Sequence, residues 1–157
     1  MNASNDRIEN IFQRILHESP SNTLGKGVSD QEILHAENEL GINLPESYKN
    51  FLKRFGYAYW PEIIYGLEDN LLPSDNIVNA NKSERMDVVP QLPIHLAAFS
   101  PDGWGNHYCM DTSRWTGDEC LIVFWNHEKD EDQNVDITHS SFLEWLSNKI
   151  ELYKDTD

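Results

Sequence analysis

Apolar residues recur at helical spacing through the first third of the chain. The stretch IENIFQRILHE carries one apolar face, formed by Ile8, Ile11, Phe12, Ile15 and Leu16. A second helix is predicted between a capping box, Ser29 with Glu32, and a left-handed C-terminal residue at Gly41. A third helix is predicted to begin at Pro45, a residue that favours the first helical position, and to end at Gly56. Its apolar stripe consists of Tyr48, Phe51, Leu52 and Phe55.

After Gly56 the pattern becomes typical of strands and turns. YAYWPEIIYGL, residues 57–67, is rich in aromatic and β-branched side chains and predicts a strand interrupted at Pro61. The polar segment from Asp75 to Arg85 predicts a short exposed helix. Strands joined by glycine-bearing turns are predicted over residues 94–99, 107–111 and 120–125. The acidic loop HEKDEDQN that follows is expected to be solvated.

A last helix is predicted to open at Ser141, which forms a second capping box with Glu144. Its buried side consists of Phe142, Trp145, Leu146, Ile150 and Tyr153. Helices, then strands, then a closing helix predict an α+β fold, with a central antiparallel or mixed sheet flanked by N-terminal helices and a C-terminal helix. Because 157 residues are enough for one self-sufficient core, we expect a single domain over residues 1–157.

Charge is the most unusual bulk property of the chain. Asp and Glu number 27 against 12 Lys and Arg, so the formal net charge is −15. Such a field repels nucleic acid and anionic membranes and attracts basic proteins. The competing interpretation is that the charge serves only to keep the protein soluble. Neither a signal peptide nor an apolar run long enough to span a bilayer is found, so we expect a soluble cytoplasmic protein with no nucleic-acid or membrane partner. Cys109 and Cys120 fit reduced thiols, and one bridge between neighbouring strands remains open.

The stretch SPDGWGNHYCMDTSRW, residues 100–115, concentrates the candidate chemistry. Alternation along a strand would place His107, Cys109 and Asp111 on one side, where His127 could complete a zinc site, but their spacing matches no standard motif. Cys109 and His107 would stand parallel, which does not suit a nucleophile and its base. Proline, aspartate and glycine at residues 101–103 predict the turn of a hairpin instead. We therefore expect no catalytic residue, metal or cofactor.

The combination AENELGINLPESYKNFLKRFG followed by IIYGLED resembles the SUKH superfamily, which includes a yeast Smi/Knr-like regulator of cell-wall synthesis and many bacterial immunity proteins. LAAFSPDGWGNHYCMDTS is similar to the strand–DGxG–strand segment of that family, and IVFWNHE to its next strand, so that the similarity spans about residues 29–150. The resemblance implies folding roles for a set of signature residues, in which Glu37 is expected to satisfy backbone donors. These are Glu37, Gly41, Leu44, Pro45, Tyr48, Phe51, Gly56, Gly66, Gly103 and Trp125.

The resemblance also implies a non-enzymatic antitoxin or immunity protein that binds and neutralises a cognate toxin of the nuclease or deaminase class. The acidic charge independently suits a basic toxin, because charge complementarity accelerates association. The alternatives are a regulatory scaffold of the cell-wall-regulator type without a toxin and, ranked below both, a small hydrolase that uses DGWGNHYC. For each tryptophan, burial in the core is the competing interpretation. The predicted partner-binding residues are Trp60, Glu62, Asp102, Trp104, Trp115, Asp118 and Glu119.

Overall fold

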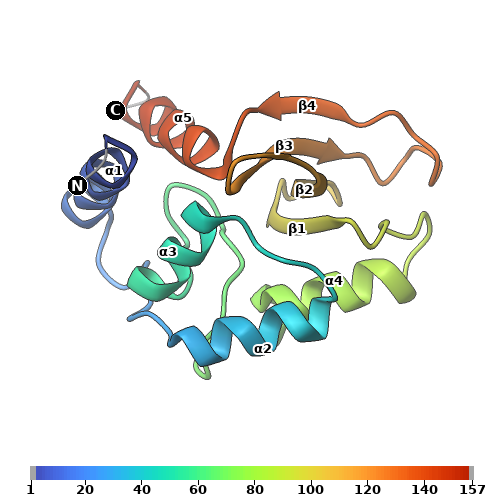
Figure 1. Ribbon diagram of the computed structural model, residues 1–157, viewed down its shortest axis with the longest axis horizontal. Coiled ribbons are helices and arrows are strands. Elements are labelled where there is room, and N and C mark those ends of the chain that lie inside the picture. The colour runs from blue at the N-terminus through green and yellow to red at the C-terminus, as the bar shows by residue number, and fades with distance from the viewer. Residues whose placement is uncertain (1–2, 156–157) are drawn as a thin grey trace.

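The computed structural model describes residues 3–155, which form five α-helices, a short 3₁₀ helix and a four-stranded antiparallel sheet of order β1-β2-β3-β4 (Figure 1). The α+β prediction is confirmed; residues 1–2 and 156–157 of the predicted domain lie outside the described residues. No helix in the described range is long and apolar enough to cross a membrane. The elements are α1 (Ala3–Glu18), α2 (Asp30–Leu40), α3 (Glu46–Phe55), η1 (Pro73–Asp75), α4 (Ile77–Met86), β1 (Leu96–Pro101), β2 (His107–Thr116), β3 (Glu119–Trp125), β4 (Asp136–His139) and α5 (Phe142–Asp155).

Local capping signals fix the ends of α2 and α3. The backbone N–H of Glu32 donates to the Ser29 hydroxyl and the Glu32 carboxylate accepts from the Ser29 N–H, both at 3.2 Å, so the capping box is confirmed. Gly41 ends α2 with φ of 72°, as predicted. Pro45, predicted as the first helical residue, instead precedes the helix in an extended conformation, and its carbonyl accepts the first bond, from Lys49, at 3.0 Å.

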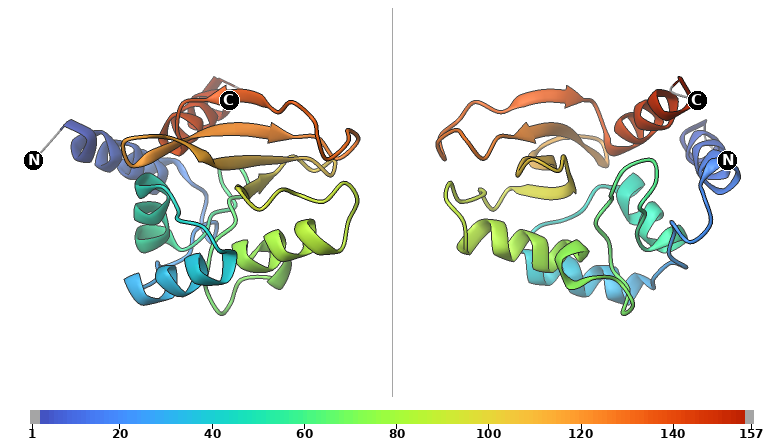
Figure 2. Two further views of the ribbon diagram at one scale, coloured as in Figure 1. Left: turned by 45° about the vertical axis from the view of Figure 1, so that its right-hand side comes forward. Right: turned by 180° about the vertical axis from the view of Figure 1, so that it is seen from behind.

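The arrangement of the helices corrects the prediction for α4, and two residues depart from the predicted apolar faces. Figures 1 and 2 show α2 and α4 side by side beyond β1, and α1 beside α5. Because α4 packs against both α2 and β1, it is not the exposed helix predicted for this segment: Ile77 and Asn81 are fully buried. Leu16 is 48% exposed because it follows Ile15 by one position and turns away from the buried face. Tyr153 is 41% exposed, with its ring edge-on to Trp60.

The strand predicted over residues 57–67 does not form. This segment folds back on itself, so that the N–H of Ile64 donates to the Ala58 carbonyl at 2.8 Å, in an isolated bridge. Another isolated bridge joins Gly66 to Asn76, next to the start of α4. Ile64 and Tyr65 belong to the core. The aromatic and β-branched composition of this segment therefore reflects burial and not strand pairing.

The sheet differs from its prediction mainly in its last strands. β2 extends to Thr116 rather than to residue 111, and β4 was not predicted because four polar-rich residues carry little periodicity. Asp111 pairs with Leu121 and Trp115 with Cys120, so that residues 112–114 bulge out of the β2–β3 ladder.

Apolar side chains cover both faces of the sheet. One face packs against the helices in the main core, where Phe99 contacts Trp145 with ring centroids 4.8 Å apart. The other face carries a smaller cluster, formed by Leu92, Leu96, Ala98, Cys109, Val123 and Trp125. Side chains alternate between the two faces along each strand, so the two thiols lie on opposite faces of the sheet. Cys109 lies in the small cluster and Cys120 in the main core, and both are free.

A buried side-chain amide completes the hydrogen bonding of the edge strand β1. Asn81 on α4 is fully buried, and its Oδ1 accepts the Ala98 N–H at 2.8 Å. Its Nδ2 donates to the carbonyls of Ala98, at 2.9 Å, and of Ile77, at 2.8 Å. One amide thus replaces the neighbouring strand that β1 lacks at this position, and it fastens α4 to the sheet.

We predict that Asn81→Ala lowers the free energy of unfolding by about 3 kcal/mol, because the Ala98 N–H and carbonyl would be buried without partners. Urea denaturation measures this change. Asn81→Asp, which keeps the shape but cannot donate to either carbonyl, should also destabilise the protein. The exposed Asn38→Ala on α2 is the control and should change stability by less than about 0.5 kcal/mol. A loss below about 1 kcal/mol for Asn81→Ala would contradict this role for the amide.

Candidate functional site

The predicted partner-binding residues occupy three segments of the structure. Trp60 and Glu62 lie in the irregular segment beside α5, with Trp60 packed on the core and on Tyr153. Asp102 and Trp104 lie in the β1–β2 turn. At the opposite end of β2, in or beside the β2–β3 hairpin, lie Trp115, Asp118 and Glu119. The structure therefore does not bring Trp104 and Trp115 together.

The β1–β2 turn is held by the side chain of Asp102. Its Oδ1 accepts the N–H of Trp104 at 2.8 Å and that of Asn106 at 3.1 Å, while its Oδ2 accepts the Asn106 side-chain amide at 2.8 Å. Burial acts to raise the pKa of Asp102, but these hydrogen bonds outweigh it and hold the pKa below its ordinary value. Gly103 and Gly105 supply the positive φ values of 86° and 91° that the turn requires.

Trp104 projects from this turn into solvent. Its side chain is 81% exposed, whereas Trp125 and Trp145 are almost fully buried. Tryptophan is highly buried on average, so an indole that contributes so little to the core is unusual. Aromatic side chains presented in this way form the energetic centres of many protein interfaces.

The acidic loop packs directly against the turn. The Asn106 Oδ1 accepts the backbone N–H of His127 at 3.0 Å and lies 2.7 Å from the His127 Nδ1. A Cβ on Gly105 would lie 2.9 Å from the His127 ring, so a larger residue there would push the loop away. Residues 127–132 are exposed, as predicted, and they line a shallow hollow with Val89 and Pro90. We call residues 102–106 and 127–132 with Val89 the acidic turn surface.

The contribution of the acidic loop to this surface was not anticipated. Its negative charge is explicit in the sequence, but its position beside Trp104 depends on the Asn106–His127 contacts across the sheet end. Val89 is 89% exposed and belongs to the segment that is bonded to the acidic loop. The bond is formed two residues later, where the backbone N–H of Gln91 donates to the Glu131 carboxylate at 3.1 Å. The clustering of acidic residues directly after a strand was the available signal.

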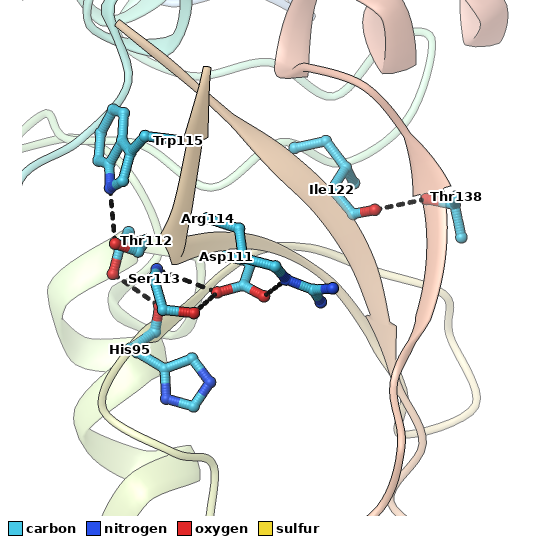
Figure 3. Close-up of polar contacts among 8 residues, drawn as sticks. All are labelled: His95, Asp111, Thr112, Ser113, Arg114, Trp115, Ile122 and Thr138. Carbon is cyan, nitrogen blue, oxygen red and sulfur yellow. Dashed lines mark hydrogen bonds and ion pairs between the residues drawn. The ribbon is translucent and has the colours of Figure 1, made fainter. Parts of the chain in front are cut away.

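The opposite end of β2 is organised around the buried Asp111 (Figure 3). Its Oδ1 accepts the Ser113 N–H and hydroxyl at 3.0 and 2.6 Å, and its Oδ2 accepts Arg114 Nε at 2.7 Å. The Trp115 indole, 38% exposed, donates to the Thr112 carbonyl at 2.6 Å. These bonds rigidify the bulge, and they satisfy the polar groups of Asp111 and Trp115 within the chain.

Two of the predicted acidic partner-binding residues are drawn into the fold. Burial raises the pKa of Glu119, whose carboxylate accepts the backbone N–H of Ser47 at 2.8 Å and its hydroxyl, fixing the hairpin to the first turn of α3. Burial also raises the pKa of Glu62, with Lys149 acting in the opposite direction. Asp118 is exposed and its carbonyl accepts the Glu46 N–H at 3.0 Å.

The three side chains considered as zinc ligands have separate partners. His107 Nε2 lies 3.0 Å from the Tyr65 hydroxyl, and Asp111 is bound to Ser113 and Arg114. Cys109 is fully buried, which raises the pKa of its thiol, and its sulfur contacts the His107 carbonyl rather than the ring. Within residues 3–155 no group of three or more His, Cys, Asp or Glu is placed to hold a metal ion.

Several of the signature residues join one element to another. Glu37 on α2 accepts the Leu44 N–H at 2.7 Å and so closes the α2–α3 connection. The buried Tyr48 hydroxyl donates to the Tyr65 carbonyl, and Gly66, where a Cβ would collide with the Gly56 carbonyl, donates to the Asp75 carbonyl at 3.1 Å. Pro45, Phe51 and Trp125 are buried, and Gly103 shapes the turn described above.

Comparison with known families finds a match over most of the chain. A sequence model of the family described as SUKH_5: SMI1-KNR4 cell-wall matches residues 7–151. The match contains the whole span, about 29–150, over which the sequence resembles the SUKH superfamily, and it adds most of α1. It also includes the acidic turn surface.

Burial makes His107 a source of acid sensitivity. Its side chain is 6% exposed, and burial lowers its pKa to about 4, with Asp102 opposing and His127 reinforcing this shift. In the unfolded chain a histidine titrates near 6.5, so between about pH 6.5 and 4 the unfolded state binds more protons. The fold therefore loses stability as the pH falls through this window, on the order of 3 kcal/mol in total.

We predict that His107→Gln removes this contribution, so that the free energy of unfolding falls less steeply from pH 6.5 to 4 than in the wild-type protein. Urea denaturation at several pH values measures the slope, whatever the absolute stability of the variant. The exposed His17→Gln on α1 is the control and should retain the wild-type slope. Equal slopes for His107→Gln and wild type would contradict the assignment.

Proposed function

The chain belongs to the SUKH family, described as SMI1-KNR4 cell-wall, and from this premise we propose that it is a non-enzymatic immunity protein that binds and neutralises a basic toxin in the cytoplasm. The toxin is of the nuclease or deaminase class, as the resemblance to bacterial SUKH immunity proteins implies. The acidic turn surface is the proposed binding site. The observation that carries this proposal is the 81% exposure of Trp104 beside an exposed acidic loop.

Trp104 supplies the apolar part of the proposed interaction. The turn that bears it is held by Asp102, Asn106 and the positive φ of Gly103, so little backbone entropy would be lost on binding. An indole buried in a pocket of the partner is a typical hot spot. The Trp115 indole is a weaker candidate because it is less exposed and its N–H is already bonded to the Thr112 carbonyl.

The acidic loop supplies the electrostatic part. Glu128, Asp130, Glu131 and Asp132 outweigh Lys129 within residues 127–132, and the whole chain carries −15. A toxin that seeks nucleic acid is basic, so the two proteins attract each other over a distance of about one Debye length. Rapid association is what an antitoxin requires, because the toxin must be captured before it reaches its substrate.

A regulatory scaffold is the second candidate function. The family description, SMI1-KNR4 cell-wall, favours a scaffold, because it points to the cell wall rather than to a toxin. The same surface would serve either function, and the identity of the partner separates them. A single basic toxin indicates immunity, whereas several cell-wall or signalling proteins indicate a scaffold.

The test is affinity capture from native-host lysate at low salt, with the bound proteins identified by mass spectrometry and the principal partner then purified. We predict that Trp104→Ala weakens binding of that partner by at least about 2 kcal/mol, or about 30-fold, while the thermal unfolding midpoint is unchanged. Trp115→Ala, at the other end of β2, is the matched control. A toxin-like partner that binds Trp104→Ala as tightly as wild type would contradict the proposed site. No basic partner from cells that express the toxin would contradict the immunity function.

We predict a separate kinetic effect for the acidic loop. The triple variant Glu128→Gln, Asp130→Asn and Asp132→Asn should lower the association rate at low salt by at least about 10-fold, with less effect at high salt. Glu131 is left in place because it binds the Gln91 N–H. A triple variant with the same net charge, Asp6→Asn, Asp30→Asn and Asp69→Asn, is the control. Equal rates in stopped-flow experiments for the two triple variants would show that net charge alone attracts the partner.

A further inference from the structure

A cavity lined by both polar and apolar groups lies between α4 and the end of the β1–β2 hairpin. Its wall on the α4 side includes Ser83 and Glu84, and its hairpin side includes Pro101 and His107. Pro101 and His107 are paired in the ladder and close the turn that carries Trp104. The cavity therefore opens at the same end of the hairpin as the acidic turn surface.

Glu84 brings a carboxylate without a partner into this cavity. The side chain is partly buried, and among residues 5–153, whose side chains the structure describes, nothing donates a hydrogen bond to it or forms an ion pair with it. Burial raises the pKa of Glu84 above its ordinary value, against the opposing effect of His127. A partly buried carboxylate without a cation costs folding free energy, so the fold itself gives no reason for it.

The cavity wall includes buried polar groups, and one of them has no hydrogen-bond partner among the described residues. The Tyr65 hydroxyl lies 3.0 Å from His107 Nε2, whereas Nδ1 of this ring, which is 6% exposed, has no hydrogen-bond partner in the described part of the chain. Burial raises the pKa of Tyr65, and Asp75 and Glu84 raise it further. His107 is neutral at pH 7, so it does not offset the negative charge of Glu84.

We propose that this cavity, the α4 pocket, receives the guanidinium group of an arginine side chain from the protein partner, with Glu84 as its charged acceptor. The proposal rests on the proposed function, because it supplies the specific contact by which a basic partner would be recognised. A guanidinium is planar and weakly hydrated, so it enters a partly buried site at lower cost than an ammonium group and can bind a carboxylate through two N–H groups. The Tyr65 and Ser83 hydroxyls offer further acceptors on the same walls.

The test uses a free probe and therefore does not require the natural partner. N-acetyl-L-arginine methylamide is titrated into the ¹⁵N-labelled full chain at pH 7 and low salt, and amide and imidazole NMR shifts are followed. The neutral isostere N-acetyl-L-citrulline methylamide and the corresponding lysine derivative are titrated in parallel. We expect saturable shifts at Ser83, Glu84 and His107 with the arginine probe, weaker ones with lysine and none with citrulline.

Glu84→Gln should weaken binding of the arginine probe by at least about 10-fold, because it removes the charged acceptor but keeps its shape. The same variant should unfold at a higher temperature than wild type at pH 7, because a partly buried charge is lost. Asp6→Asn on α1 changes the net charge equally and is the control. Shifts that citrulline reproduces, equal affinity in Glu84→Gln, tighter binding of lysine, or no saturable shift at these residues would each overturn the proposal.

The titration and the capture experiment fail independently. If the arginine probe does not bind but a basic partner is still captured through Trp104, the α4 pocket is wrong and the proposed function stands. If the probe binds Glu84 specifically but no basic partner is captured, the pocket stands as a guanidinium site and the proposed function is wrong.

Discussion

The unpaired edge of β1 is the constraint on which the rest of this structure depends. No further strand of the described chain follows β1 in the sheet, so its buried backbone groups must be satisfied by other segments. The Asn81 side chain on α4 forms hydrogen bonds with the Ala98 N–H and carbonyl. The backbone N–H of Tyr65 donates to the Phe99 carbonyl at 2.7 Å. These contacts fix α4 and residues 57–67 against the sheet edge. They also place Glu84 beside the hairpin end and so create the α4 pocket.

The two ends of β2 have different characters, and the difference supports the proposed binding site. At the bulge, Asp111 satisfies Ser113 and Arg114, while Glu119 fastens the hairpin to α3, so polar side chains there serve the fold. At the β1–β2 turn, the polar groups hold the backbone, but the indole of Trp104 contributes little to the core. A binding surface needs a rigid backbone and a large side chain that is not already packed in the core, and this turn has both. This end also carries the acidic loop and the α4 pocket.

Features encoded by local sequence were predictable, and those set by long-range contacts were not. The caps of α2, the glycine that ends it and the β1–β2 turn follow from residues within a few positions of each other. Residues 57–67 have a strand-like composition, yet their bridges are set by distant partners such as Leu24 and Asn76. The separation of Trp104 from Trp115 depends on the register of β2, which neither tryptophan specifies. The burial of Asn81 and the partial burial of Glu84 could not be predicted, because a polar residue on a helix with mostly polar residues gives no sign of burial.

We propose that the acidic turn surface binds a basic protein partner. Hydrogen–deuterium exchange of the chain, alone and saturated with the purified captured partner, tests it most directly because every amide reports its own protection. We predict slower exchange at residues 102–106 and 127–132 in the complex, with residues 113–119 unchanged. Protection centred on residues 113–119, with the β1–β2 turn exchanging as in the free protein, would contradict it.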